Sequence, residues 1–210
     1  MNNLKTNLLC VFLGCFAIGL SQRVTTNTWK AQIALGINSP SQNGFVEGAT
    51  ANSINLPTVN LGVQHMFNTK MGAKLDYGFN RMSNEENSPE FKINYSRINV
   101  QFVYDPSSVF YFLPSEIRTV FHTGPGYSFA TPLNNLDRNK QSYLNWLAGL
   151  EIHYALSEKV SVYLDYSYIH GFTDLENYDP ALSGLGAFNG SVNNLTFGVS
   201  ISLSGCQFCD

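Results

Sequence analysis

Charged side chains are scarce in this chain: only 13% of its 210 residues are Asp, Glu, Lys or Arg, about half the share of an average globular protein. The formal net charge is −3, and a weakly acidic chain without a clustered basic footprint gives no support to nucleic-acid binding. Aromatic residues are plentiful instead, with 11 Tyr, 15 Phe and 2 Trp. Few charges and many aromatic rings are typical of a wall that faces hydrocarbon.

Long apolar runs are missing beyond the first 21 residues. A membrane helix needs about 20 apolar residues, so the sequence excludes an α-helical membrane protein and leaves a β-barrel open. The run from Leu8 to Leu20 follows Lys5 and precedes the small residue Ser21, which predicts a secretory signal peptide over 1–21. A lipoprotein signal at Cys15 is disfavoured, because apolar residues continue after it. We therefore expect an exported protein with a mature barrel domain over 22–203 and a short tail over 204–210.

Cysteine is rare as well, and two of the four, Cys10 and Cys15, lie in the predicted signal peptide. The other two, Cys206 and Cys209, form a CxxC motif at the C-terminal end. A redox-active CxxC opens a helix, which this position does not offer, and a metal site would need two further ligands. We expect a local disulfide or two free thiols here, and no cofactor or metal.

About eight segments alternate apolar and polar residues with period 2, the periodicity of a β-strand. Between Gly72 and Phe79, for example, Lys74 and Asp76 fall on the face opposite the apolar residues, and the same division holds for the charges of the other segments. The segments begin near Trp29, Thr58, Met71, Phe91, Ile117, Asn145, Val160 and Asn194. The pattern predicts an all-β fold, an eight-stranded antiparallel up-and-down transmembrane barrel with its polar face inside. The fifth segment is the weakest, because Gly124-Pro125-Gly126 interrupts it.

The connections between these segments alternate in length. Those after segments 1, 3, 5 and 7 are long and polar, whereas those after segments 2 and 6 span only a few residues. Long outer loops and short periplasmic turns are typical of outer-membrane barrels; only the turn containing Pro106 and Pro114 is longer than expected. The aromatic residues on the apolar parity fall into two zones, as interfacial girdles would. Tyr77, Phe79, Tyr127, Trp146, Tyr166 and Tyr168 lie towards the loops, and Trp29, Phe102, Tyr104 and Tyr154 lie towards the turns.

On these residues the chain resembles the eight-stranded transmembrane domain of the OmpA-like outer-membrane proteins, in the form found in Bacteroidota-type bacteria. The resemblance covers about Trp29 to Leu203. The short sequence segments that carry it are Trp29–Gly36, Gly124–Tyr127, Tyr154–Val162 and Phe197–Leu203. It implies a monomer in the cell outer membrane, in contact with the bilayer and lipopolysaccharide, with a narrow pore for small solutes gated by exchange of ion-pair partners. The C-terminal peptidoglycan-binding domain usual in that family is not found after Leu203, so we do not expect cell-wall tethering.

Six charged residues should line the interior of this barrel: Lys30, Lys74, Asp76, Arg97, Glu151 and Asp165. Three charges of each sign in a narrow barrel should form ion pairs, because an unpaired buried charge is strongly disfavoured. An eight-stranded barrel is just wide enough for its own side chains to fill it. We therefore expect a neutral polar network that fills the lumen and has a structural role. The functional alternative is a narrow pore.

An outer-membrane lipid-modifying enzyme, of the lipid A deacylase type, is a further alternative. It would need a serine near a histidine that an acidic group orients. The candidates near the longest loop are Ser167, His170, Asp174 and Glu176. Their parity turns Ser167 inward and His170 outward, and the inward histidines His122 and His153 lack a serine at matching height. We expect no catalysis.

Two other possibilities concern the outside of the barrel. A soluble barrel that binds an apolar ligand would show the same alternation with its faces exchanged, but six strand charges are too few to solvate a whole exterior. The long loops Ser39–Leu56 and Gly171–Ser191 are candidates for binding a surface ligand. Their possible contact residues are Phe45, Tyr178 and Phe188.

Overall fold

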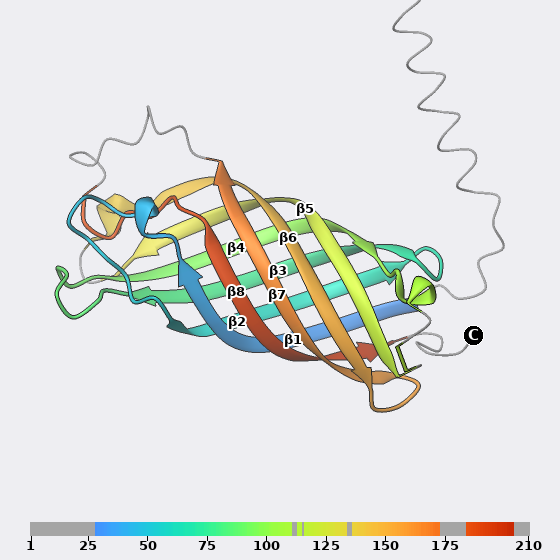
Figure 1. Ribbon diagram of the computed structural model, residues 1–210. Helices are drawn as coiled ribbons and strands as arrows, with labels where there is room; N and C mark the ends of the chain where they lie inside the picture. Colours follow the sequence, from blue (N-terminus) through green and yellow to red (C-terminus); the bar gives the residue numbers. More distant parts are fainter. Residues whose placement is uncertain (1–27, 111–112, 115, 134–135, 173–183, 204–210) are drawn as a thin grey trace, which may run out of the picture.

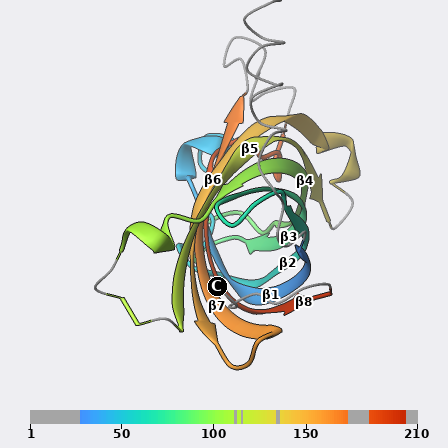
Figure 2. The same cartoon turned by 90° about the vertical axis from the view of Figure 1, so that its right-hand side faces the viewer.

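The protein is a closed antiparallel barrel of eight strands, in which each strand pairs with the next and β8 pairs with β1 (Figure 1). This computed structural model describes residues 28–110, 113–114, 116–133, 136–172 and 184–203. The strands are β1 Thr28–Pro40, β2 Asn55–Met66, β3 Met71–Ser83, β4 Lys92–Tyr104, β5 Ile117–Pro132, β6 Gln141–Ala155, β7 Val160–Phe172 and β8 Val192–Ser202. The predicted fold class is confirmed. Figure 2 looks at the ring of strands from the end that carries the short turns.

Alternating side chains explain why these segments form a barrel wall. Along β3 and β8 every second residue is buried while its neighbours are exposed or half-buried, as period-2 geometry requires. The buried positions are mostly polar and the exposed ones mostly apolar; Leu35, for example, is 61% exposed and Phe197 59%. Such an inverted pattern suits hydrocarbon outside and polar groups inside. The predicted girdle residues Trp29, Tyr127 and Trp146 are all exposed on this wall.

The fifth strand runs without a break through the segment that we expected to interrupt it. Gly124, Pro125 and Gly126 keep their register with β6. On the other side, the pairing with β4 skips the two residues opposite, Val100 and Gln101. A proline has no N–H to donate to a neighbouring strand, so the irregularity is confined to the β4 side of β5.

Several strands reach further towards the loops than their sequence pattern indicated. β3 continues to Ser83 and β5 to Pro132, so residues that we assigned to polar loops belong to the wall. The expectation that every strand charge faces inward is wrong for Lys92, which lies in the predicted fourth segment, and for Arg81, which the longer β3 adds to the wall. Both are exposed on the outer face. The inward placement of the other strand charges is not affected.

The two ends of the barrel differ in their connections. We call the end with the long connections, 41–54, 84–91, 133–140 and 173–191, the loop end, and the end with connections 67–70, 105–116 and 156–159 the turn end. Three 3₁₀ turns lie in these connections: η1 Gln42–Gly44, η2 Ser107–Val109 and η3 Asp137–Asn139. No helix in the described part of the chain is long and apolar enough to cross a membrane.

The long connections are hydrogen-bonded to one another. The first joins the second through the backbone N–H of Glu85, which donates to the carbonyl of Thr50. It joins the fourth through the N–H of Asn189, which donates to the carbonyl of Gly44. The third meets the fourth through the amide of Asn139, which donates to the carbonyl of Leu185. The described loop residues thus form one connected cap.

The interior is layered along the barrel axis. At the loop end lies an apolar cluster, which we call the plug: Phe45, Ala49, Ala51, Met82, Phe91, Ile93, Tyr95, Ala130, Tyr143, Leu147, Ile169, Phe188 and Val192. A polar layer follows, and a small apolar cluster of Met66, Val103 and Val120 lies towards the turn end. The expectation of a polar network filling the lumen is therefore wrong at its ends, because the loops fold apolar side chains into the barrel mouth.

The plug also changes the interpretation of two loop residues. Phe45 and Phe188 were candidates for contacts with a surface ligand, but they are only 6% and 0% exposed. Each loop turns its phenylalanine into the mouth, and the two residues form an isolated antiparallel bridge. Residues of the predicted signal peptide 1–21, the tail with Cys206 and Cys209, and Asp174, Glu176 and Tyr178 lie outside the described residues.

Candidate functional site: the polar lumen

All six charged residues predicted for the interior are buried inside the barrel: Lys30, Lys74, Asp76, Arg97, Glu151 and Asp165. The structure brings four of them together as two ion pairs, Lys74 with Glu151 and Arg97 with Asp76. The third pair that we expected does not form. Asp165 contacts a histidine instead, and Lys30 lies nearer the turn end, level with Gln64 and Ser202.

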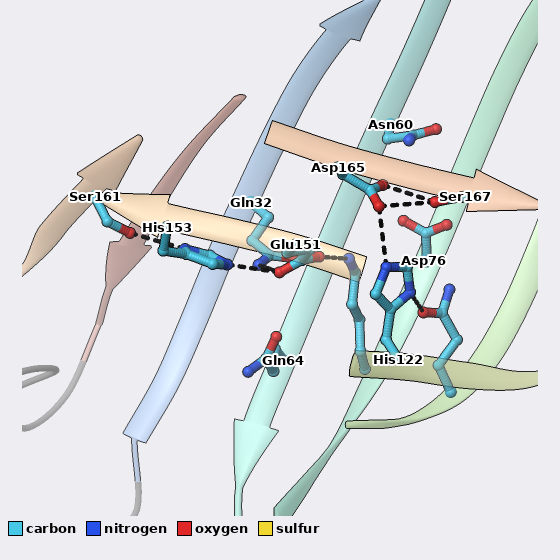
Figure 3. A network of polar contacts seen from close by, with 12 residues as sticks. Gln32, Asn60, Gln64, Asp76, His122, Glu151, His153, Ser161, Asp165 and Ser167 are labelled. Carbon is cyan, nitrogen blue, oxygen red and sulfur yellow. Dashed lines mark hydrogen bonds and ion pairs between the residues drawn. The ribbon is translucent and has the colours of Figure 1, made fainter. Parts of the chain in front are cut away.

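Glu151 on β6 is the centre of the first cluster. Its Oε1 accepts from Nζ of Lys74 on β3 at 2.6 Å, and its Oε2 accepts from the side-chain amide of Gln32 on β1 at 3.1 Å. His153 contributes a third contact, with Nε2 2.7 Å from Oε2 of Glu151, and its Nδ1 lies 3.1 Å from Oγ of Ser161 on β7 (Figure 3). The carboxylate of Glu151 therefore links β6 to β1 and β3 directly, and His153 extends the chain of contacts to β7.

Arg97 on β4 is the centre of the second cluster. Its Nη1 donates to Asp76 on β3 and to Oδ1 of Asn99 at 3.2 Å. Its Nη2 donates to Oδ1 of Asn60 on β2 at 3.1 Å. The guanidinium lies over its cross-strand neighbour Gly78, where a Cβ atom would meet Cζ at 2.6 Å. Only a glycine leaves room for the arginine in this position.

A third cluster is built around His122 on β5. Its Nδ1 lies 2.7 Å from Oε1 of Gln101, and its Nε2 lies 3.0 Å from Oδ1 of Asp165 on β7. Oγ of Ser167 donates to both oxygens of that carboxylate, at 2.9 and 2.8 Å (Figure 3). The imidazole thus bridges Gln101 of β4 and Asp165 of β7.

The expectation that the inward histidines lack a serine at their height is wrong. The register places His122 level with Gly149 and, one strand further, with Ser167. His153 contacts Ser161 directly. The arrangement at Ser167 is not a catalytic triad, because its hydroxyl donates to the carboxylate rather than to the imidazole, whereas a nucleophilic serine must be hydrogen-bonded to its base. Ser161, His153 and Glu151 do form a hydrogen-bonded chain of serine, histidine and carboxylate. All three are buried inside the barrel and Glu151 is already paired with Lys74, so the hydroxyl of Ser161 is closed to a substrate.

Three side chains of the lumen have donor atoms close enough to converge on a metal ion. One atom each of His122, Glu151 and Asp165 lies within 4.8 Å of the other two. All three groups are already engaged, with Lys74 in contact with Glu151 and the hydroxyl of Ser167 in contact with Asp165. An ion could bind here only if these partners moved away, so the geometry favours hydrogen bonds and ion pairs over metal ligation.

The polar layer also contains buried atoms that lack a protein partner among the described residues. They are Gln32 Oε1, Asn38 Oδ1, Gln64 Oε1, Asn80 Oδ1, Arg97 Nε, Gln101 Nε2, Asn194 Nδ2, Thr196 Oγ1 and Ser200 Oγ. Buried polar groups of this kind are normally satisfied by internal water. The middle of the barrel therefore offers sites for ordered water between its charged clusters.

Several residues of these clusters were not singled out by sequence reasoning. His122 and His153 were placed inside but given no role, and the amides of Gln32, Asn60, Asn99 and Gln101 were not considered. Their inward parity was visible in the sequence. Parity gives no information on which strands meet across the lumen, so the partners of these side chains could not be assigned.

Comparison with known proteins places this barrel among outer-membrane proteins. The profile of the family described as outer membrane protein beta-barrel domain matches residues 8–202. A major outer membrane protein from Thermus thermophilus has a TM-score of 0.61 at 12% identity, covering 85% of this chain and 100% of that chain. Neisserial surface protein A gives 0.56 at 14% identity (87% and 100% covered), and OprG from Pseudomonas aeruginosa gives 0.53 at 14% identity (85% and 97%). At these identities the likeness is one of fold alone. No curated protein matches this chain.

Proposed function

This chain belongs to the outer membrane protein β-barrel family and lies in the cell outer membrane, and we propose that it is a non-catalytic structural barrel that is closed to solutes at rest. The observation that carries this proposal is the apolar plug at the loop end. The polar layer next to the plug, with its two ion pairs, stabilises the wall. Because β8 pairs with β1, the barrel has no free edge strand and can function as a monomer.

The plug is held by aromatic contacts between loops and wall. The ring centroids of Phe45 and Phe188 lie 4.7 Å apart, and Phe45 lies 5.4 Å from Phe91. Phe188 also meets Tyr95 of β4 edge to face at 6.0 Å. A hydrated ion or small solute that entered here would have to displace three buried phenylalanines, each of which buries a large apolar area.

The polar layer would oppose conduction for a different reason. An ion passing the middle of the lumen would have to separate or bypass the pair of Lys74 and Glu151, which are 2.6 Å apart and almost fully buried. Breaking a buried pair without replacing the lost contacts costs about 3–5 kcal/mol. A pore at this level requires new partners for both charges.

Planar-bilayer recording of the purified protein tests the proposal. We expect no single-channel conductance above background for the wild type or for Glu151→Ala, because the plug remains in both. Phe45→Ala combined with Phe188→Ala should produce channel openings when Glu151→Ala is also present. The matched control replaces two phenylalanines of the outer wall, Phe102 and Phe197. Steady conductance of the wild type would overturn the closed barrel and favour the narrow pore.

A second candidate function rests on a different pair of residues. His170 Nδ1 and Ser191 Oγ lie 3.2 Å apart on the exposed rim of the loop end, which is the contact a serine hydrolase needs between base and nucleophile. The serine considered from the sequence, Ser167, is buried and cannot serve. No acidic side chain among the described residues is hydrogen-bonded to His170, so a lipid A deacylase lacks its orienting group there. Deacylation of lipid A that is lost in both Ser191→Ala and His170→Ala would establish the enzyme.

A further inference from the structure

Two basic side chains stand together on the outer wall of the barrel. In the described strands, Arg81 of β3 and Lys92 of β4 are the only Lys, Arg, Asp or Glu residues on the outward face. The register pairs Arg81 with Asn94 and Ser83 with Lys92, which makes the two basic residues diagonal neighbours, about 7–8 Å apart at their backbones. The chain as a whole is acidic, at −3, so a positive pair here is a local feature.

The guanidinium of Arg81 is held against the wall. Its Nε donates to Oδ1 of Asn94 at 3.0 Å, and its Cζ lies 6.0 Å from the centre of the Phe79 ring. These contacts occupy the Nε edge and one face of the Arg81 guanidinium. The two Nη nitrogens form the fork with which arginine binds a phosphate through two parallel hydrogen bonds, while a lysine adds a mobile point charge.

The height of the pair on the wall matches a membrane head-group region. Tyr77 and Tyr127 flank Ile98 in the register of β3, β4 and β5, and exposed tyrosines of this kind mark the interface. Arg81 lies four residues beyond Tyr77, or about 13 Å further along the strand. The outward residues of β4 in this stretch, Ser96 and Asn94, are polar, whereas their neighbours Phe79 of β3 and Phe129 of β5 are aromatic. The loop end of an outer-membrane barrel faces the cell exterior.

We propose that Arg81 and Lys92 bind a phosphate group of lipid A, the phosphorylated glycolipid of the outer leaflet. Arg81 supplies the bidentate fork, Lys92 supplies the second positive charge, and Asn94 fixes the arginine in place. The acyl chains of the lipid then lie along the apolar wall below, where Leu75 and Val100 are exposed. This inference concerns the outer wall and does not depend on whether the lumen conducts.

The loop 84–91, which joins the two strands that carry the pair, offers a different way to bind the same lipid. Glu85, Glu86 and Glu90 are exposed in the loop 84–91, and carboxylates bind phosphate only through a bridging divalent cation. Binding by the basic pair should persist in EDTA, whereas binding by the glutamates should disappear. The two routes are therefore separable in one titration.

Native mass spectrometry of the purified barrel in detergent, titrated with bisphosphorylated lipid A in EDTA, tests the proposal. Arg81→Gln combined with Lys92→Gln should raise the apparent Kd about tenfold or more, the effect of roughly 1.4 kcal/mol. The control, Lys70→Gln with Lys159→Gln, removes the same charge from exposed turns at the opposite end and should bind as the wild type does. Heat-modifiable gel mobility verifies that each variant is folded.

Titration of the wild-type protein with two forms of the lipid provides a second, independent test. It should bind lipid A that lacks both phosphates about tenfold more weakly than the bisphosphorylated form. Equal affinity for the two lipids, an unchanged Kd in the folded double variant, or loss of wild-type binding in EDTA would each overturn the assignment. None of these results would alter the conductance expected from the plug.

Discussion

Lys74 and Glu151 lie 77 residues apart in the sequence and meet across the lumen with 2.6 Å between Nζ and Oε1. The contact joins β3 to β6, which are not neighbours in the barrel. It is reinforced by Gln32 of β1 and by His153. A single ion pair thus connects distant parts of the wall, and we expect its loss to destabilise the whole barrel.

Replacing either member of this pair should destabilise the protein strongly. We expect Lys74→Ala or Glu151→Ala to lower the free energy of unfolding by about 3–5 kcal/mol, because the remaining charge stays buried. The double variant Lys74→Met with Glu151→Leu should recover most of that loss. Urea unfolding in lipid vesicles, followed by tryptophan fluorescence, measures both effects. Lys70→Ala in an exposed turn is the control, with an expected change within about 0.5 kcal/mol; additive losses in the double variant would contradict the pairing.

Gly149 provides the space in which His122 reaches Asp165. A Cβ atom at this position would overlap the imidazole ring and come within 2.9 Å of Oγ of Ser167. We expect Gly149→Ala to cost about 1–3 kcal/mol of unfolding free energy through overpacking. In a His122→Ala background the same change should cost much less, because the methyl group then has room. Equal costs in both backgrounds would mean that the ring is not held over Gly149.

Phe188 should contribute more to stability than a phenylalanine on the outer wall. The plug buries it completely, whereas Phe197 of β8 is 59% exposed. We expect Phe188→Ala to cost about 3–5 kcal/mol and to make the loops more susceptible to limited proteolysis. Phe197→Ala should cost clearly less and leave the proteolysis pattern unchanged. A similar response of the two variants would show that the loops do not pack into the barrel mouth in the membrane.

The two tryptophans report where the membrane interfaces lie. Trp29 and Trp146 are both exposed on the outer wall, the first at the turn end and the second towards the loop end, where its Nε1 donates to Oγ1 of Thr123 at 2.8 Å. In vesicles containing brominated lipids, bromine near the head groups should quench both more strongly than bromine at the bilayer centre. Single-tryptophan variants, Trp29→Phe and Trp146→Phe, separate the two signals. Emission insensitive to bromine at every depth would favour a soluble barrel.

The wall of this protein was predictable because its signal is local. The alternation around Lys74 and Asp76 assigns each side chain to a face, and the spacing of the segments gives the number and order of strands. The ends of strands were less visible, since the polar residues between Arg81 and Lys92 suit an exposed strand end as well as a loop. That ambiguity concealed Arg81, whereas Lys92 lay inside a predicted segment and its outward parity was overlooked.

The partners inside the lumen were not predictable from alternation. Asp165 could have met Lys30 on charge alone, but the register of β5, β6 and β7 places it beside His122. The plug was missed for a similar reason. Phe45 and Phe188 lie in polar connections, and only the pairing of those connections turns their side chains into the mouth.

Alternation within each segment was enough to predict an eight-stranded barrel with apolar side chains outside and most charged ones inside, because period-2 geometry is a property of each strand alone. The tertiary structure decided which charges meet, which loop residues close the mouth and which basic side chains share the outer wall. Those relationships depend on the register between strands distant in sequence, and no local pattern encodes that register.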